Sequence, residues 1–290
     1  ISVGLSGCFA AFIANTWDLP VFLHVERGGE QFDESALARI PSGQGANLSY
    51  APYDPEVGIA PGELAVLFLS QEIDGASMMP SCPVAPAMQN VTSVSGTGIG
   101  QAFSIRTRYP VVAYQVYPFG GGPSAATSAT LLLPESAWGD NYVAASAYAA
   151  DIGHPSLNVL AKDDDTTVTI NPSAKIHGST AVSTTEAGQP LSVKLSRGQY
   201  LQITQEEDLS GSVVLADKDI AVFGGHTCLR IPIGTQACDP AQQQLPPVRP
   251  HLRFGVGARA DVAGGPQGRH VPVLEPARRG CPEPRGPGPR

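Results

Sequence analysis

Two cysteines in the last third of the chain have the spacing of a cross-linked pair. Cys228 and Cys238 are separated by nine residues that include Pro and Gly. A loop of this size closes easily, and a disulfide across it would contribute about 2–3 kcal/mol in the chain-entropy account. Free thiols, or a metal site that adds His226 and Asp239, are the alternatives, but the spacing matches no common zinc pattern. The sequence therefore predicts a Cys228–Cys238 disulfide.

The other cysteines leave their pairing open. Apart from Cys281, which lies in an atypical C-terminal segment, Cys8 and Cys82 remain, and the sequence does not decide whether they pair. Two glycosylation sequons begin at Asn47 and Asn90. Together with the low Lys content and the predicted disulfide, they predict an extracellular or cell-surface location.

Two acidic clusters are the main candidates for catalysis. Asp163-Asp164-Asp165 could hold a hard cation, but no complete calcium-loop spacing follows, so a solvated turn before a strand is the favoured interpretation. Glu206-Glu207-Asp208 could contribute to sugar hydrolysis or could be an acidic surface loop. A carbohydrate- or peptide-processing enzyme, the alternative function, would need Asp163, Glu206 and Asp208 to converge at one cleft.

Other reactive-looking residues favour structural roles. His24 and His226 could act as bases but are interpreted as structural histidines, and the glycines of residues 96–100 precede a strand instead of the helix that a phosphate loop needs. Neither a Gly-x-Ser-x-Gly elbow nor a His-Glu-x-x-His helix occurs in the sequence. We therefore predict no catalytic, cofactor-binding or metal-binding residues, and no enzyme.

Aromatic residues provide the candidate binding surface. Trp17, Tyr117, Trp138 and Tyr142, with Tyr114 nearby in sequence, could form a platform for a protein or glycan ligand. Sparse aromatics in a β protein also serve as core residues, so both interpretations stay open. Only the fold can separate them.

The elements that would position these residues are short β-type runs in a repeated order. The chain contains 32 glycines and 27 prolines among its 290 residues, which leaves few stretches in which a helix could form. The matching runs are residues 12–15, 20–25, 64–69 and 109–114 in a first copy, and 159–162, 167–170, 200–204 and 218–223 in a second. This order predicts a duplicated unit, which typically builds a scaffold or a binding surface.

The predicted fold is all-β with two tandem, related β-sandwich-like units. The first covers residues 1–120, a linker covers 121–128 and the second unit covers 129–248. Blades of a β-propeller are the alternative architecture. No apolar run approaches the roughly 20 residues of a membrane-spanning helix.

Residues 249–290 have a different chemistry from the rest. They contain eight Arg, eight Pro, eight Gly and four Ala and carry a net charge of +5 (eight Arg against three acidic residues), whereas residues 1–248 carry −13 (10 basic, 23 acidic). We predict a disordered tail and hypothesise that it is a frameshift product of a GC-rich gene, in preference to a nucleic-acid-binding arm.

Several ordered motifs resemble one known family. They are Arg197-Gly198-Gln199-Tyr200, Asp208-Leu209-Ser210-Gly211-Ser212, residues 216–226, Ala237-Cys238-Asp239-Pro240 and Gln244-Leu245-Pro246-Pro247, with upstream blocks at residues 109–118, 131–134 and 163–170. In this order they resemble the IgGFc-binding protein N-terminal domain family over residues 6–248. The chain looks like a bacterial-type member that is truncated at its C-terminal end.

The resemblance implies an extracellular or cell-surface binding or adhesion module. Its ligand would be a protein or a glycan, and the resemblance implies neither a cofactor nor a nucleic-acid partner. Antibody binding is not carried over, because no motif here corresponds to an antibody contact. A structural surface-layer component is the third function considered.

Overall fold

The computed structural model describes residues 7–71, 80–90, 92–120, 128–147, 152–236, 238–248 and 269–273. These residues are almost entirely β, which confirms the predicted fold class. The described helical elements are short: α1 (Glu34–Leu37), η1 (Gly45–Asn47) and η3 (Glu135–Ala137). Strands were expected because β-branched residues alternate with polar ones between Gly- and Pro-containing turns.

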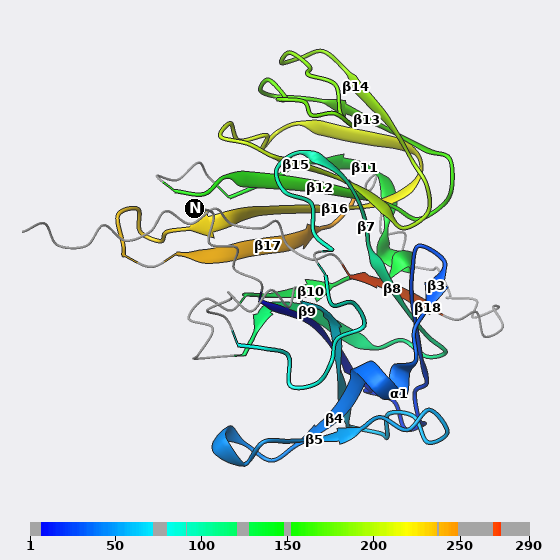
Figure 1. The fold of residues 1–290 in the computed structure, drawn as a ribbon. Coiled ribbons are helices and arrows are strands. Elements are labelled where there is room, and N and C mark those ends of the chain that lie inside the picture. The colour runs from blue at the N-terminus through cyan, green and yellow to red at the C-terminus, as the bar shows by residue number, and fades with distance from the viewer. Residues whose placement is uncertain are drawn as a thin grey trace, which may run out of the picture.

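A six-stranded sheet forms the lower part of the molecule in Figure 1, with the order β10-β9-β1-β6-β4-β5. Its strands are β1 (Cys8–Ala14), β4 (Ala38–Ser42), β5 (Ser49–Pro52), β6 (Leu64–Ser70), β9 (Val112–Phe119) and β10 (Ser128–Leu132). All of its pairings are antiparallel. Strand β1 lies in the middle, between β6 and β9.

An eight-stranded sheet forms the upper part, with the path β14-β13-β16-β12-β15-β7, and β11 and β17 also pair with β16. Its strands are β7 (Gly98–Gln101), β11 (Gly139–Val143), β12 (Pro155–Ala161), β13 (Thr166–Asn171), β14 (Leu191–Leu195), β15 (Gln199–Thr204), β16 (Val213–Leu229) and β17 (Asp239–Leu245). The long strand β16 reaches four partners because its two halves pair with different strands.

A four-stranded sheet of order β18-β8-β2-β3 completes the fold. It consists of β2 (Leu23–Arg27), β3 (Glu30–Gln31), β8 (Phe103–Thr107) and β18 (Arg269–Val273). Strand β18 belongs to the segment predicted to be a disordered tail, and its Val273 is fully buried. The prediction of a disordered tail is therefore wrong for residues 269–273, which form a strand. The remainder of that segment lies outside the described residues.

The repeated order of the sequence has a counterpart in the sheets. Strands β9-β1-β6 and strands β16-β12-β15 are arranged in the same antiparallel order. Ile13 lies between Ala65 and Ala113, and Leu160 in the same way lies between Tyr200 and Ala221. The arrangement differs outside these three strands, because β13 pairs with β16 whereas β2 pairs with β8 in a separate sheet.

Similar glycine turns precede the matching strands β6 and β15. Gly62 and Gly198 have φ angles of 77° and 73°, which a residue with a side chain adopts only with strain. The N–H of Gly62 donates to the carbonyl of Asn15, and that of Gly198 donates to the carbonyl of Ala161. Each turn thus ties the start of one strand to the end of its neighbour.

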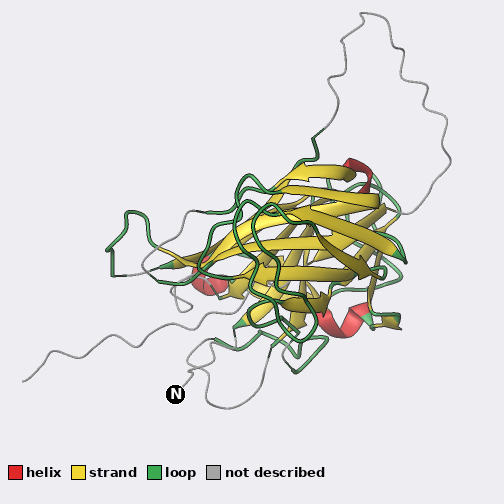
Figure 2. Ribbon diagram, turned by 90° about the horizontal axis from the view of Figure 1, so that it is seen from above, coloured by secondary structure: helices red, strands yellow, loops and turns green. Residues whose placement is uncertain are grey.

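One hydrophobic core is shared by all three sheets. It joins residues of β1 and β6 with residues of β2 and β8, and it also includes Leu160, Tyr200, Ala221 and Phe223 from the eight-stranded sheet. Seen from above in Figure 2, the strands of the stacked sheets run in broadly the same direction. Large sheets packed on a common core form sandwich-like layers, unlike four-stranded blades around a channel.

Two smaller cores use the opposite faces of the two large sheets. Val159 and Val222 belong to a core inside the eight-stranded sheet, while Ala10 and Phe68 pack with residues of the 80–90 segment on the outer face of the six-stranded sheet. The change of face between Val159 and Leu160 is the period-2 alternation of a strand. The central strands of both sheets are therefore covered on both faces.

The two large sheets also meet through buried polar side chains. Gln115 donates to the side-chain carbonyl of Gln242, and the Thr130 hydroxyl donates to the Gln242 backbone carbonyl at 2.9 Å. The N–H of Leu133 donates to the Gln244 side chain at 2.6 Å. These bonds satisfy the buried amide groups of Gln115 and Gln244, and they account for Gln242 and Gln244 in the glutamine run of β17.

Two strands cross the predicted boundary between the units. β7 adds to β15 although it lies in residues 1–120, and β10 adds to β9 although it lies after that unit. This exchange gives each sheet an edge strand from the other part of the chain. The division at residues 121–128 stays a prediction, and residues 121–127 lie outside the described part.

The part of the chain that the structure describes contains two disulfides. Cys228 pairs with Cys238, as the sequence predicts, and Cys8 pairs with Cys82, which the sequence left open. Cys8 begins β1, so the second bridge fastens the 80–90 segment onto the outer face of the six-stranded sheet. Because a disulfide uses both thiolates, Cys228 and Cys238 do not act as metal ligands.

Candidate functional site

A cleft of about 420 Å³ opens between the four-stranded sheet and the eight-stranded sheet. We call it the inter-sheet cleft, and its lining consists of Glu26, Gly28, Gly29, residues 101–104, Arg106, Glu135, Trp138, residues 160–162, Asp164 and residues 196–199. Its size falls within the range of about 300–1,000 Å³ of small-molecule sites. The cleft therefore brings together both predicted units.

Two glycine-containing turns contribute to the lining of the cleft. Gly28 and Gly29 have φ angles of 59° and 87° in the hairpin between β2 and β3, and Gly198 forms the turn before β15. Glu135 and Trp138 come from η3 and the residue after it. The opening thus depends on glycines that favour the left-handed backbone region.

The three cations that line the cleft are each paired with a carboxylate, and for Lys162 this partner lies outside the lining. The Arg106 guanidinium lies 2.5 Å from the Glu26 carboxylate, and Arg197 lies 3.6 Å from the same carboxylate. Lys162 lies 2.8 Å from Asp219. These groups are partly exposed, so their value for stability is small, but their positions are mutually constrained.

Glu135 is the most unusual ionisable group of the cleft. Burial raises the pKa of its carboxyl, and the charge of Asp163 adds to the rise, while Lys162, Arg197 and Arg106 act in the opposite direction. Lys162 has a raised pKa, chiefly through its hydrogen bond to Asp219. A carboxylate surrounded by three cations can accept hydrogen bonds from a ligand and hold those cations in place.

The Asp163-Asp164-Asp165 segment is a turn whose charges are used internally. The N–H of Arg197 donates to the Asp164 carboxylate at 3.0 Å, and Asp165 forms an ion pair of 2.8 Å with Lys194. The hydrogen bond from Lys194 lowers the pKa of Asp165. This arrangement is the solvated turn favoured above, with Asp165 itself at φ 55°.

The second acidic cluster lies at the opposite end of the sheet. Residue 163 follows the end of β12 and residue 206 follows the end of β15, and these two strands are antiparallel. A seven-residue strand is about 20 Å long. Asp163, Glu206 and Asp208 therefore do not converge on one cleft, as the enzyme alternative requires.

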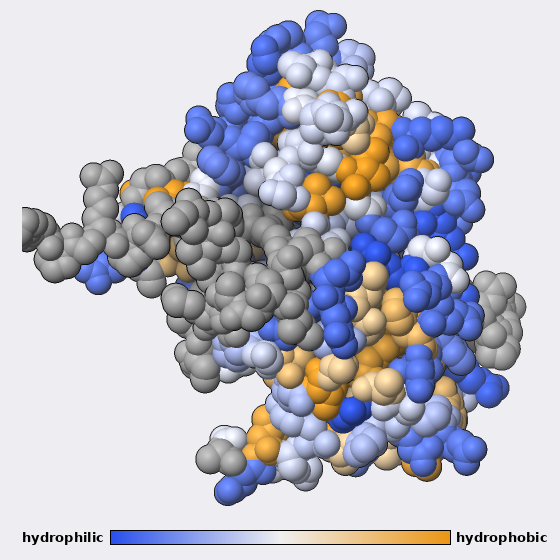
Figure 3. Space-filling view, viewed as in Figure 1, coloured by the Kyte–Doolittle hydropathy of each residue, from blue (hydrophilic) through white to orange (hydrophobic). Residues whose placement is uncertain are grey.

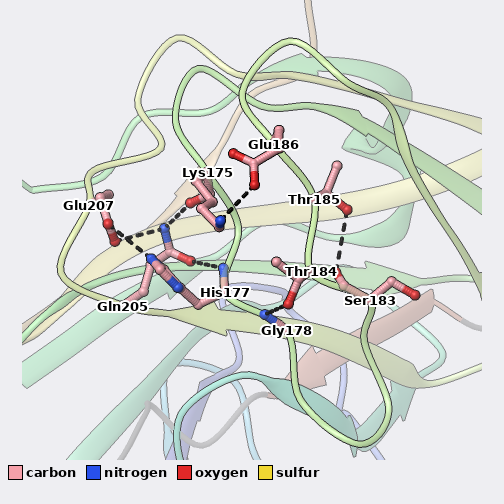
Figure 4. A network of polar contacts seen from close by, with 9 residues as sticks. All are labelled: Lys175, His177, Gly178, Ser183, Thr184, Thr185, Glu186, Gln205 and Glu207. Atoms are coloured by element: carbon pink, nitrogen blue, oxygen red, sulfur yellow. Dashed lines mark hydrogen bonds and ion pairs between the residues drawn. The ribbon is translucent and has the colours of Figure 1, made fainter.

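Glu207 belongs to a polar network between loops, drawn in Figure 4. His177 lies 2.9 Å from Glu207, which lowers the pKa of Glu207, and Gln205 donates to the Lys175 carbonyl at 2.7 Å. Lys175 also lies 2.6 Å from Glu186. Figure 3 shows hydrophilic side chains over the β13–β14 loops at the top of the molecule, so this network fastens exposed loops.

The remaining candidates have structural positions. His226 is buried in β16 and its Nδ1 accepts the N–H of Cys228 at 3.1 Å, whereas His24 is exposed on β2. Glycines 98 and 100 lie within or at the start of β7, which pairs with β15. Within the described ranges, no group of three or more His, Cys, Asp and Glu side chains could hold a metal ion.

Three of the four predicted surface aromatics are core residues, which corrects that expectation. Tyr117, Trp138 and Tyr142 are 7%, 6% and 1% exposed. Tyr142 donates to the carbonyl of Ile220 at 2.6 Å, and Trp138 donates to that of Leu133 at 3.2 Å. Because backbone carbonyls accept the hydrogen bonds of the Tyr142 hydroxyl and the Trp138 indole N–H, these two rings can pack in the protein interior.

Trp17 is exposed, and a larger apolar surface lies on the same sheet. Tyr114 pairs across the strands with Leu131 on one side and Phe12 on the other, and Val112 lies two residues away on the same face. We call these four side chains the outer apolar row. Val112, Tyr114 and Leu131 are 37%, 40% and 38% exposed.

Sequence reasoning missed the inter-sheet cleft and most of the outer apolar row. The cleft residues are scattered between positions 26 and 199, and only the pairing of distant strands unites them. The row had one available signal, because Val112 and Tyr114 alternate with buried residues along β9. Reading that alternation requires knowledge of which face is covered.

The fold and its surfaces define a β-sandwich-like protein with a polar cleft and an exposed apolar sheet face. Residues 128–251 match the model of the family described as IgGFc binding protein, and this match confirms, over these residues, the resemblance drawn from the motifs. Comparison with curated proteins and with solved structures gave no match. The family indicates an extracellular binding module, which the two disulfides fit.

Among the described residues, no helix has the length and apolarity to cross a membrane.

Proposed function

We propose that the chain is an extracellular adhesion module without catalytic activity, which binds a protein partner through the outer apolar row. The observation that carries the proposal is the contiguous exposure of Val112, Tyr114 and Leu131 on neighbouring strands. Exposed contiguous apolar groups rimmed by polar residues are typical of protein interaction sites. The family match supports a binding role.

Trp17 adds an aromatic edge near this surface. Its ring packs against Tyr109 at 5.7 Å, and its indole N–H donates to the carbonyl of Pro110, two residues before Val112. Trp and Tyr are enriched among the residues that dominate binding energy. The ring is held in place before a partner arrives, which reduces the entropy cost of binding.

A second exposed aliphatic group provides a contrast. Val143 and Val213 are paired across β11 and β16, and Leu215 lies on the same face. They are 49%, 37% and 45% exposed, but the group contains no aromatic residue. It therefore serves as a control surface of similar exposure on the other sheet.

Surface plasmon resonance against immobilised extracellular proteins tests the proposal. The first probe is the Fc fragment of IgG, since the family description names it, followed by a panel of mucins and matrix proteins. The Tyr114→Ser/Leu131→Ser variant should lose more than tenfold in affinity for any protein that binds. The Val143→Ser/Val213→Ser variant should keep the wild-type affinity.

Equal binding by both variants would reject the outer apolar row as the site. Light scattering separates the structural alternative, because a surface-layer component would assemble into large particles without any added partner. A monomer that binds none of the probes would contradict the adhesion proposal for those protein classes.

A further inference from the structure

The inter-sheet cleft has a balanced charge although the protein is acidic. Its lining contains three cations, Arg106, Lys162 and Arg197, against three carboxylates, Glu26, Glu135 and Asp164. The whole chain carries a net charge of −8. A cleft that selected a simple anion or cation would show an excess of one sign, so the charge balance favours a ligand without net charge.

The cleft offers hydrogen-bond donors and acceptors side by side. An Arg side chain has five N–H donors, so the ion pair with Glu26 uses only part of the donor capacity of Arg106. Gln101, Gln199 and Ser104 add neutral groups from three different elements. The Oε1 of Gln199 accepts the N–H of Ser196 at 2.8 Å, which leaves its amide nitrogen as a donor on that side.

The floor beneath these groups is apolar. Phe103, Trp138 and Leu160 line the cleft and belong to the shared core. Gly28, Gly29 and Gly198 also line the cleft and add no side chain to it. A ligand that suits the site therefore has polar groups around its edge and an apolar face.

We propose that the inter-sheet cleft binds a neutral saccharide of one or two sugar rings. Each sugar hydroxyl donates one hydrogen bond and accepts others, which matches a lining of alternating donors and acceptors. The C–H face of the ring lies toward the side of the cleft that Phe103, Trp138 and Leu160 line. Glu135 accepts from the ring hydroxyls, while Arg106 and Lys162 donate to them.

This site is independent of the outer apolar row, because it lies between the four-stranded and eight-stranded sheets and shares no lining residue with that row. The adhesion proposal and the saccharide proposal can therefore fail separately. A protein ligand on the six-stranded sheet would leave the cleft accessible.

Saturation-transfer NMR with the full chain tests the inference. The probes are glucose, galactose, mannose, N-acetylglucosamine, lactose and cellobiose, with glucuronate and glucosamine as charged comparisons. At least one neutral sugar should receive saturation from the protein. Calorimetry should show that both charged sugars bind more weakly than this neutral sugar. Ser196→Trp, which places a large ring at an exposed position of the rim, should abolish the transfer.

A matched control separates blocking of the cleft from a general effect. Ser192→Trp adds the same ring at an exposed position of β14 outside the cleft lining and should leave the transfer unchanged. Glu135→Gln should weaken binding at least fivefold, and melting curves establish that each variant is folded. The proposal is overturned if no neutral sugar shows transfer, if Ser196→Trp leaves it intact, or if a charged sugar binds more tightly.

Discussion

The two large sheets share a three-stranded centre but are covered differently. Around β9-β1-β6, one face packs on the four-stranded sheet and the other is covered in part by the 80–90 segment. Around β16-β12-β15, one face enters the shared core and the other closes over a core of its own sheet. The strands attached to each centre, more than the centre itself, decide which surfaces remain accessible.

The difference in how the two sheets are covered decides where the candidate binding surfaces lie. Strand β12 is buried along its whole length, whereas the face of β9 beyond the reach of the 80–90 segment leaves Val112 and Tyr114 exposed. The inter-sheet cleft arises where β2 pairs with β8 and not with the central sheet. Binding candidates therefore appear where the strands around β1 are covered differently from the strands around β12.

The largest expected loss of stability comes from a substitution in the shared core. Phe223→Ala should lower the free energy of unfolding by about 3–5 kcal/mol, because the ring is fully buried in the core that includes residues of the six-stranded sheet. Calorimetry should still show one cooperative transition at a lower temperature, because both large sheets depend on this core. Val213→Ala, on the exposed face of the same strand, should change stability by less than about 0.5 kcal/mol.

Two separate calorimetric transitions, with only the second affected by Phe223→Ala, would contradict the shared core.

The disulfides should differ in their contribution. The Cys8–Cys82 bridge closes a loop with a sequence separation of 74, and Cys228–Cys238 closes one of 10. In the chain-entropy account their removal by Cys→Ser pairs should cost about 4 and about 3 kcal/mol, respectively. Urea unfolding of the two double variants measures the difference, and a reversed order would show that the attached segment matters more than loop length.

Substitutions in the two matching glycine turns should lower stability by smaller amounts, which are similar to each other. Gly62→Ala and Gly198→Ala should each cost about 1–2 kcal/mol because both φ angles are positive. Gly198→Ala should cost more, since its added Cβ would lie 2.6 Å from the Gln101 amide nitrogen, whereas that of Gly62 meets open space. Equal losses in urea unfolding would indicate that Gln101 moves aside freely.

The smallest expected effect is the pH response of Glu135. Its folded-state pKa is raised, chiefly by burial, so the folded protein holds this proton at pH values where the unfolded chain has released it. Its contribution to stability is therefore full below the ordinary pKa of 4.5 and declines as the pH rises through the folded-state value.

Glu135→Gln should flatten this part of the profile of melting temperature against pH. Asp165→Asn is the contrasting control, because the pKa of Asp165 is lowered and its contribution disappears as the pH falls. A Glu135→Gln profile identical to that of the wild type would show that the carboxyl is not desolvated.

Much of the fold was predictable because local patterns carry it. The runs at residues 64–69 and 200–204 became β6 and β15, and their preceding glycines became the turns that the sequence indicated. The Cys228–Cys238 pairing was predictable because a short loop limits the choice of partner. The aromatic surface was not, because burial of Tyr117, Trp138 and Tyr142 depends on the packing of strands that lie far apart in the sequence.

By itself the sequence determined the β class, several of the strands, one disulfide and the family resemblance of residues 128–251. These follow from periods of two, from turn residues and from motifs that lie close together in the chain. Tertiary structure alone decided the shared core, the Cys8–Cys82 bridge, the place of β18 and the inter-sheet cleft. Each of these joins residues far apart in sequence, and their contacts exist only once distant strands have paired.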